Sequence, residues 1–269
     1  MSFFSSRTPL VFAHRGASLT CPENTFSAFD AGISARADGL ELDVQLSADG
    51  VVVVHHDLTL ERTTNATGPV AAKTASELAC VDAAYHFELN GKFPFRGQDC
   101  GIPTLAQVLR RYTDLRLIIE LKNNVAELGE AVIREVRTAD AGERVCVAGF
   151  GSRAIQTIRR TMPELATSAH RNEVRLALYR SWIGVPPCKA AYQGYQVPEF
   201  AGHIRIVSPR FIRHAHQAGL HVQVWTVDAA NDIRRFLNWE VDALISNRPD
   251  VAVAVRDTWT EATKKSLLL

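Results

Sequence analysis

Titratable side chains stand at or just beyond the ends of four apolar, strand-like runs in the sequence. These polar residues are His14 and Arg15, Glu41 and Asp43, His55 and His56, and Glu120 and Lys122. Carboxylates that lie close together can hold a cation, and histidines exchange protons near neutral pH. If the runs are neighbouring strands, these carboxylates and histidines indicate metal-assisted acid–base chemistry on an anionic substrate.

The acids of the run at residues 40–45 are expected to point into the protein. Side chains alternate along a strand, so Glu41, Asp43 and Gln45 share one face, and the two leucines and Val44 share the other. Two buried carboxylates side by side repel each other, and a bound cation removes that cost. An edge strand with one solvated face is the alternative for this run.

Glu120 supplies a third acid. It lies in a nearly all-apolar run at residues 117–121, which is typical of a strand buried on both faces, so the acid needs a partner. That partner is either the same cation or Lys122 in a plain salt bridge. Three carboxylates without nearby thiolates favour Mg²⁺ or Ca²⁺ over zinc.

A cation beside Arg15 and Lys122 would create a positive pocket, which suits a phosphate or a phosphodiester. His14 and His56 could then serve as general base and general acid. Taken alone, His14 would more often be a structural histidine. Its position at a strand end, followed by Arg15 and Gly16, reverses that preference.

Strand-like and helix-like segments alternate along the chain, which is typical of parallel strands joined by helical crossovers. About eight such units without a linker predict an α/β fold, a (β/α)8 TIM-type barrel, with a doubly wound open sheet as the structural alternative. The active site of such a barrel lies at the carboxyl ends of the strands. The expected strands are residues 10–13, 40–45, 51–55, 115–121, 144–147, 165–168, 192–197, 221–227 and 243–246, and the expected helices are residues 24–37, 125–138, 152–161, 172–182, 209–218, 229–239 and the end of the chain from residue 258.

Residues 58–103 depart from this alternation. They lack clear periodicity and carry turn signals such as Asn90-Gly91 and Gly101-Ile102-Pro103. A structureless loop of this length is unusual in a compact domain. We therefore expect residues 1–269 to form a single barrel domain, with residues 58–103 as a small cap inserted over one end.

The composition is that of an ordinary globular protein, with 269 residues, 46% hydrophobic and 22% charged positions and a formal net charge of +1. This composition excludes a disordered chain and a coiled coil. The small net charge gives no overall electrostatic attraction to nucleic acid or to an anionic membrane. No apolar run reaches the roughly 20 residues of a membrane span, and the N-terminus lacks a signal-peptide pattern. Cysteines that are odd in number and scattered predict reduced thiols in a cytoplasmic protein. They are Cys21, Cys80, Cys100, Cys146 and Cys188.

A series of short motifs, in order along nearly the whole chain, resembles the glycerophosphodiester phosphodiesterase family. The motifs are His14-Arg15-Gly16-Ala17-Ser18, Pro22-Glu23-Asn24-Thr25, Glu41-Leu42-Asp43-Val44, Asp49-Gly50, His56-Asp57, Glu120-Leu121-Lys122, Val224-Trp225-Thr226-Val227 and Asp242-Ala243-Leu244-Ile245-Ser246-Asn247. Each motif is weak alone, and the ordered set is specific.

The resemblance implies a barrel with a cap after the second strand and hydrolysis of a glycerophosphodiester, such as glycerophosphocholine or glycerophosphoethanolamine, to glycerol 3-phosphate and an alcohol. The implied residues are Glu41, Asp43 and Glu120 as ligands of one divalent cation (Mg²⁺ or Ca²⁺), His14 and His56 as the acid–base pair, Arg15 and Lys122 as phosphate contacts, and Trp225 as a wall of the alcohol pocket. The choice of His56 over His55 rests on Asp57, which follows it.

Two other functions stay open. Lysophospholipase D-type hydrolysis of lysophospholipids would keep the same chemistry and would need an apolar groove. The cap could supply one with Tyr85, Phe87, Phe93 and Phe95, and these residues could equally form the core of the cap itself. A barrel that binds a phosphorylated ligand without turnover is the alternative from another class, and the intact set of acids and histidines argues against it.

Overall fold

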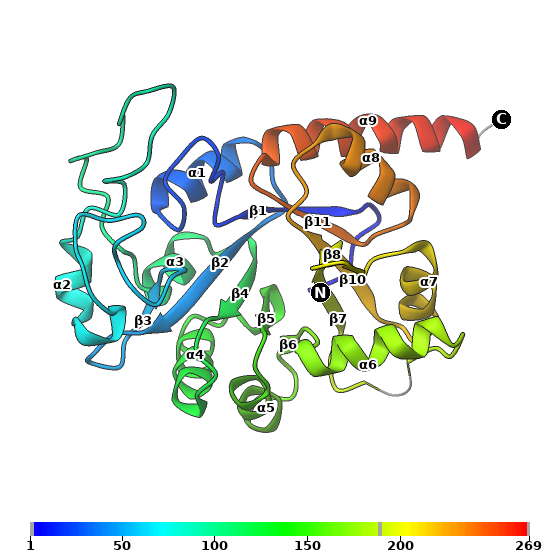
Figure 1. Cartoon of the computed structure of the whole chain (residues 1–269), viewed down its shortest axis with the longest axis horizontal. Coiled ribbons are helices and arrows are strands. Elements are labelled where there is room, and N and C mark those ends of the chain that lie inside the picture. The colour runs from blue at the N-terminus through cyan, green and yellow to red at the C-terminus, as the bar shows by residue number, and fades with distance from the viewer. Residues whose placement is uncertain (1–2, 188–189, 268–269) are drawn as a thin grey trace.

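The computed structural model describes residues 3–187 and 190–267, and within them eight parallel strands and their connecting helices form a nearly closed barrel (Figure 1). The parallel strands are β1 (Leu10–His14), β2 (Gly39–Leu46), β4 (Arg116–Leu121), β5 (Val145–Gly149), β6 (Ala166–Thr167), β7 (Gly194–Pro198), β10 (His221–Trp225) and β11 (Ala243–Ser246). The helices that follow them are α1 (Phe26–Ser34), α3 (Leu105–Arg111), α4 (Ala126–Thr138), α5 (Ser152–Thr161), α6 (Arg171–Trp182), α7 (Pro209–Gln217), α8 (Ala230–Asn238) and α9 (Pro249–Leu267).

The strand order shows how the barrel closes. It runs β6-β5-β4-β2-β1-β11-β10-β7, and each neighbouring pair is parallel. At the remaining seam between β6 and β7, Ser168 and Gly194 form an isolated parallel bridge. The predicted (β/α)8 barrel is thus confirmed, and the doubly wound alternative, which would leave two open sheet edges, is wrong.

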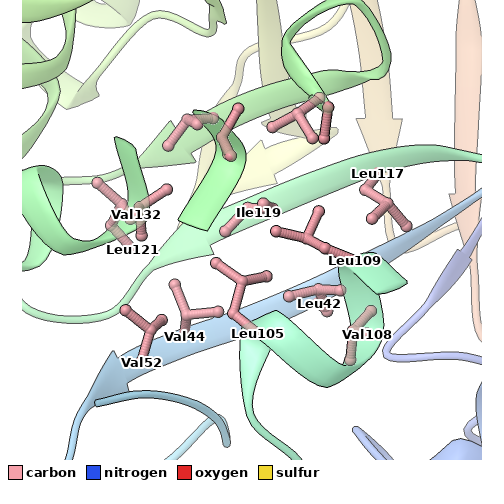
Figure 2. Close-up of a cluster of buried hydrophobic side chains, with 14 of the residues drawn as sticks. Leu42, Val44, Val52, Leu105, Val108, Leu109, Leu117, Ile119, Leu121 and Val132 are labelled. Atoms are coloured by element: carbon pink, nitrogen blue, oxygen red, sulfur yellow. The ribbon is translucent and has the colours of Figure 1, made fainter. Parts of the chain in front are cut away.

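Alternation along β2 decides which of its side chains face the barrel interior. Leu42 and Val44 lie in the apolar layer between the strands and helices α3 and α4 (Figure 2). Glu41 and Asp43 occupy the intervening positions and therefore point to the opposite side, into the barrel. The register pairs Glu41 with the last residue of β1 and Asp43 with Glu120 on β4. Sheet pairing itself therefore brings residues that are distant in the sequence to one place.

Strand β3 (Val52–Val54) differs from the predicted arrangement. It pairs antiparallel with the end of β2 and lies outside the eight parallel strands, so residues 51–55 are not one of the crossover units. The hairpin folds the chain back onto β2, and the His55 amide donates to the Asp43 carbonyl oxygen at 3.0 Å. His56 reaches the barrel mouth by this return, and not at the carboxyl end of a parallel strand.

The 58–103 segment separates β3 from α3. It contains a short 3-10 helix, Val70–Ala72, and helix α2 (Ala75–Ala79), which begins with a capping box between Thr74 and Glu77. Its apolar side chains make a small cluster of their own with Val53, and this cluster contains Leu60, Val70, Leu78, Ala83 and Ile102. In Figure 1 the segment (cyan to teal) lies on the opposite side of the molecule from α6 and α7.

Four further elements differ from the predicted ranges or were not expected at all. Helix α3 was not expected, and a two-stranded hairpin of β8 (Phe200–Ala201) and β9 (Ile204–Arg205) follows β7. Helix α9 begins at Pro249, well before the expected start at residue 258. Helices α3 and α9 complete the pattern of one helix after each parallel strand. The hairpin is an addition after β7, and the order of the barrel strands is unchanged.

The described cysteines are all free, and Cys188 lies outside the described residues. Cys146 is buried inside the barrel, where Gln196 Nε2 approaches its sulfur at 3.8 Å. Among the described residues, no helix combines the length and the apolar character needed to cross a membrane.

Gly39, the first residue of β2, leaves no room for a side chain. A Cβ atom there would lie 2.4 Å from the Arg116 carbonyl oxygen and 2.6 Å from the Phe12 ring. Gly39→Ala is expected to lower the free energy of unfolding by roughly 1–3 kcal/mol, because backbone and ring must both move. Urea unfolding measures this, with Gly142→Ala as control, since its Cβ would meet only the Met162 methyl at 3.2 Å. Equal midpoints for the two variants would contradict the packing argument.

Candidate active site

Three carboxylates from two adjacent strands meet at the barrel mouth. Glu41, Asp43 and Glu120 each offer an oxygen atom within 4.8 Å of the other two. Glu41 and Asp43 are 4% and 1% exposed, so water screens their repulsion poorly. Burial and the charge of Asp43 raise the pKa of Glu41 well above its usual value, and the same causes raise the pKa of Glu120. The structure brings together the three acids that the sequence analysis grouped.

Two cationic side chains lie among these acids. Arg15 Nε lies 3.0 Å from Asp43 Oδ2, and Arg15 Nη1 donates to Glu23 Oε1 at 3.0 Å. Lys122 Nζ lies 2.7 Å from Glu120 Oε1 and 3.4 Å from Asp43 Oδ1. Burial opposes the charge on Lys122, but the carboxylates of Asp43 and Glu120 raise its pKa, so the ammonium stays protonated.

A fixed amide determines which nitrogen of His14 carries the proton. Asn247 Nδ2 donates to Asp228 Oδ2 at 2.8 Å, so the amide oxygen faces the other way and accepts from Ser18 Oγ at 2.8 Å. His14 Nδ1 lies 2.7 Å from that oxygen and must therefore be the protonated nitrogen. His14 Nε2 keeps a lone pair and lies 3.8 Å from Glu41 Oε2. Burial lowers the pKa of His14, which keeps this nitrogen free at neutral pH.

His56 is oriented by an acid. His56 Nδ1 donates to Asp57 Oδ1 at 2.6 Å, and Arg62 pairs with the other oxygen of Asp57. Burial would raise the pKa of Asp57, but hydrogen bonds from Arg62 and His56 lower it to about 2, so Asp57 stays ionised. His55 is buried, and its Nε2 lies 3.2 Å from the Thr59 carbonyl oxygen. His56, unlike His55, lines the cavity described below.

Glu23 connects the loop that follows His14 to the loop that carries His56. It accepts hydrogen bonds from Arg15 at 3.0 Å and from Arg62 at 2.7 and 2.8 Å. Burial would raise the pKa of Glu23, but the hydrogen bond from Arg62 and the charge of Arg15 lower it to about 2. The loop after β1 and the loop after β3 are therefore held together by an ionised acid between two guanidinium groups.

The whole cluster carries more negative than positive charge. Its five carboxylates and three cations are Glu23, Glu41, Asp43, Asp57 and Glu120, with Arg15, Arg62 and Lys122. With the histidines neutral, two negative charges stay unbalanced. One divalent cation would balance them, and the all-oxygen donor set fits Mg²⁺ or Ca²⁺. The Glu120–Lys122 salt bridge, which the sequence offered as the alternative to a cation, is present. It does not remove the repulsion of Glu41 by the Asp43 and Glu120 carboxylates.

The turn after β1 requires glycine. Gly16 has φ +84°, and a Cβ atom there would lie 2.4 Å from the backbone of Ala28. Arg15 itself lies in the left-handed region, with φ 55°, and its amide donates to Glu41 Oε2 at 3.1 Å. The turn therefore directs both the amide and the side chain of Arg15 toward the acids.

The charged groups line one end of a cavity of about 580 Å³. The groups of the cluster that line it are His14, Arg15, Glu41, His56, Glu120 and Lys122. The rest of the lining is mostly apolar and comes from the ends of β5, β7 and β10, from α6 and from the β8–β9 hairpin, but α6 also contributes Arg171 and Arg175. Trp225 at the end of β10 belongs to this part of the lining and contacts Phe150 edge to face at 6.1 Å.

The aromatic residues of the 58–103 segment do not supply this lining. Phe87 packs edge to face on Phe95 at 5.6 Å. Tyr85 and Phe93 both contact the Arg96 guanidinium, at 4.4 and 3.7 Å. None of these four aromatic residues lines the cavity. Of the two possibilities left open for these residues, the contacts favour packing within the 58–103 segment over an apolar groove for a substrate.

The sequence analysis gave no role to several residues that hold the site together. Asn24 Nδ2 donates to Asp43 Oδ2 at 2.9 Å, and Asp228 and Ser18 fix the amide of Asn247. Asn247 directly follows the buried strand β11, and that strand-end position is the signal that could have identified it. Asp228 follows β10 by three residues and carries no comparable signal.

The chain is similar to known proteins over most of its length. A family model described as the glycerophosphoryl diester phosphodiesterase family matches residues 14–251. The glycerophosphodiester phosphodiesterase of Caldanaerobacter subterraneus is 32% identical over 251 residues, which cover 91% of this chain and 96% of that protein.

Solved structures agree with these matches. A glycerophosphodiester phosphodiesterase from Agrobacterium tumefaciens is 28% identical, with a TM-score of 0.75 over 91% of this chain and 99% of that one. A phosphodiesterase from Oleispira antarctica, in complex with the product sn-glycerol-3-phosphate, shares the fold, with 24% identity and a TM-score of 0.73 over 93% of this chain and 97% of that one. The resemblance stated from the motifs is confirmed: the chain belongs to the glycerophosphoryl diester phosphodiesterase family and is an enzyme that hydrolyses glycerophosphodiesters.

Proposed function

We propose that the enzyme hydrolyses small glycerophosphodiesters, such as glycerophosphocholine or glycerophosphoethanolamine, with a divalent cation and with His14 and His56 as the acid–base pair. The observation that carries the proposal is one cavity lined by two oriented histidines, two cations and two of the three clustered acids. The glycerol 3-phosphate bound to the Oleispira protein of the same fold supports a product of this kind. Water is added and the phosphorus–oxygen bond to the alcohol breaks, which gives glycerol 3-phosphate and the free alcohol.

The side chains have separate tasks in this proposal. Arg15 and Lys122 bind and orient the phosphate oxygens. One histidine accepts a proton at Nε2 from the attacking hydroxyl, and the other donates a proton to the departing alcohol oxygen. If a glycerol hydroxyl attacks first, the resulting cyclic phosphate is opened by water with the two roles exchanged. Trp225 lies against the alcohol.

Glu41, Asp43 and Glu120 would hold the cation. When bound, Mg²⁺ or Ca²⁺ would supply Lewis-acid stabilisation of charge on the phosphoryl oxygens. The chain itself contributes the ordered acids, and the hydrogen bond from Asn24 to Asp43 fixes one of them. The buried acids and the excess negative charge of the cluster support this assignment.

We also propose a single barrel domain over residues 1–269, with residues 58–103 as a cap subdomain inserted after the β2–β3 hairpin. The separate apolar cluster of that segment supports this division. A cytoplasmic location is proposed on the described cysteines, which are free.

Release of glycerol 3-phosphate from glycerophosphocholine tests the proposal. Purified enzyme is expected to turn over this diester with Mg²⁺ or Ca²⁺, and EDTA is expected to lower the rate by a factor of about 10² or more, because the phosphoryl charge loses its stabilisation. Adding the metal back should restore the rate. Turnover that is unaffected by the chelator would contradict the role given to the three acids.

The assay also distinguishes the enzyme from a binding protein. A barrel that only binds a phosphorylated ligand would give tight binding of glycerophosphocholine and no product after long incubation. The orientation of both histidines by Asn247 and Asp57 favours turnover, since binding alone needs no fixed Nε2 lone pair.

A further inference from the structure

The outer side of α6 differs from that of other helices around the barrel. The exposed side chains of α4 and α5 are all charged or polar, and they are Glu127, Glu130, Arg134, Arg137, Thr138, Arg153, Gln156, Arg160 and Thr161. On α6 and the residue after it, four large apolar side chains are exposed instead: Leu176 at 59%, Tyr179 at 53%, Trp182 at 50% and Ile183 at 75%. Helix α6 lies at the edge of the molecule (Figure 1). A helix that covers a barrel normally turns polar residues to water, so these side chains call for a partner.

The four side chains form one stripe. They follow one another at intervals of three or four residues, and side chains at this spacing lie on the same side of a helix. The buried residues Ala177, Leu178 and Ser181 occupy the opposite side. Tyr179 and Trp182 contact each other edge to face at 5.3 Å. We refer to Leu176, Tyr179, Trp182 and Ile183 as the α6 face.

The loop after α6 extends the α6 face. Its sequence is Ile183-Gly184-Val185-Pro186-Pro187, and Val185 is exposed. The Val185 amide donates to the Arg180 carbonyl oxygen at 2.8 Å, and the Arg180 guanidinium donates to the Pro186 carbonyl oxygen at 2.7 and 3.1 Å. The apolar loop is therefore held against the end of the helix, and helix and loop form one surface.

The charges around the α6 face have one sign. Residues 174–198 include Arg175, Arg180 and Lys189 and contain no aspartate or glutamate, in a chain whose net charge is only +1. Glu173, the acid just before this stretch, pairs with Arg159 at 2.7 Å. Among the described residues, no carboxylate pairs with Arg175 or Arg180. A partner that complements this surface must supply negative charge.

A second copy of the chain does not meet this requirement. A two-fold contact would place the α6 face against the same face of the other copy, so that arginines met arginines. A bilayer with anionic lipids supplies negative headgroups for the arginines and an acyl boundary for the apolar side chains. Tryptophan and tyrosine are the side chains that gather at the boundary between lipid and water.

We propose that the α6 face binds the surface of an anionic bilayer and makes the enzyme a peripheral membrane protein. Helix α6 then lies in the plane of the membrane, with Leu176 and Ile183 at the boundary of the acyl chains and Arg175 among the lipid phosphates. Membrane binding is separate from the choice of diester, because Leu176 and Ile183 lie outside the cavity that the acids line.

Sedimentation with vesicles tests the proposal. The full-length enzyme is mixed with sucrose-loaded vesicles of phosphatidylcholine alone, or of equal parts of phosphatidylcholine and phosphatidylserine. The partition coefficient is expected to be roughly tenfold or more higher on the mixed vesicles, because basic residues are attracted to the anionic surface. High salt should lower it, because salt screens that attraction.

Variants locate the bound surface. Leu176→Ser and Ile183→Ser should each lower the partition coefficient about fivefold and leave glycerophosphocholine turnover unchanged. Arg175→Gln should lower binding to the mixed vesicles about fivefold. The matched controls are Leu58→Ser, at a side chain that is 55% exposed in the 58–103 segment, and Arg110→Gln, at an exposed arginine of α3. Both controls should bind like the parent, and circular dichroism establishes that each variant is folded.

Brominated lipid shows whether the apolar side chains enter the membrane. Vesicles that contain it should quench tryptophan fluorescence in the parent enzyme, and most of this quenching should disappear in Trp182→Phe. Binding without quenching, together with equal binding to soluble polyglutamate, would assign the α6 face to an acidic protein and overturn the proposal.

Other results would also overturn it. An enzyme that turns over glycerophosphocholine but does not sediment with the mixed vesicles has no membrane surface, and its proposed function stands. Equal losses of binding in the α6 variants and in the controls would indicate adsorption without a defined site. A dimer that dissociates in Ile183→Ser, with no vesicle binding by the parent, would assign the α6 face to a second copy of the chain.

Discussion

Replacing either His14 or His56 by alanine is expected to lower kcat for glycerophosphocholine by a factor of about 10² or more, with the fold intact. Each ring has Nδ1 engaged, by Asn247 or by Asp57, and lines the cavity that contains the acids. One ring comes from the end of β1 and the other from the loop after β3, so neither can replace the other at the reacting atoms. Initial rates at saturating substrate and metal, together with circular dichroism, measure the effect.

Two other histidines serve as controls for this experiment. His86→Ala removes an exposed ring in the 58–103 segment and should keep kcat within a factor of about two. His55→Ala should lower stability, because the buried ring contacts the Thr59 carbonyl, and it should cost less activity than the change at His56. A rate near that of the parent enzyme in His14→Ala or His56→Ala would remove that histidine from the mechanism.

Glu41→Gln is expected to remove both turnover and stabilisation by metal. The amide keeps the size of the side chain but loses the charge that a cation requires, and kcat/KM should fall by a factor on the order of 10³. The parent enzyme should gain about 2.7 kcal/mol of stability at a metal concentration one hundred times Kd, because the ion binds only the folded state. Thermal unfolding with EDTA and with Mg²⁺ or Ca²⁺ should show this shift in the parent and not in the variant.

The same two measurements on Asp30→Asn provide the control for Glu41→Gln. Asp30 is an acid on the outside of the barrel, where it pairs with Arg111 at 2.8 Å. Its replacement should leave the metal-dependent shift in Tm and the turnover at parental values. If Glu41→Gln kept the metal-dependent shift, the cation site would have to be placed elsewhere.

Features of the site that depend on strand alternation could be predicted from the sequence. The 40–45 run alternates leucine with acid, which separates the two faces of β2, and in a barrel the leucine face packs on helices and the acid face points inward. The run before Glu120 is apolar at nearly every position, so its acid had to meet a partner. Since β2 and β4 turned out to be neighbours, these local patterns were enough to group Glu41, Asp43 and Glu120.

Features that depend on tertiary contacts could not be predicted. Strand β3 runs antiparallel to β2 because the two strands pair in a hairpin. A short apolar run in the sequence does not indicate whether its strand will be parallel or antiparallel to its neighbour. Helix α3 has only seven residues, too few for a clear helical period, and the Thr104–Gln107 capping box marks its N-terminal end only. The proton position on His14 depends on Asp228, which is more than two hundred residues away in the sequence.

The segregation of the cavity lining has a consequence for how this enzyme could diverge. The residues proposed to act on phosphorus sit on one arc of the barrel, and the remaining lining of the cavity, from β5, β7, β10, α6 and the β8–β9 hairpin, sits on the other. Insertions or exchanges in α6 and the β8–β9 hairpin can therefore alter which molecules are accepted without disturbing the hydrolytic groups. Paralogues with new preferences, and laboratory libraries aimed at them, should concentrate their accepted changes on that second arc.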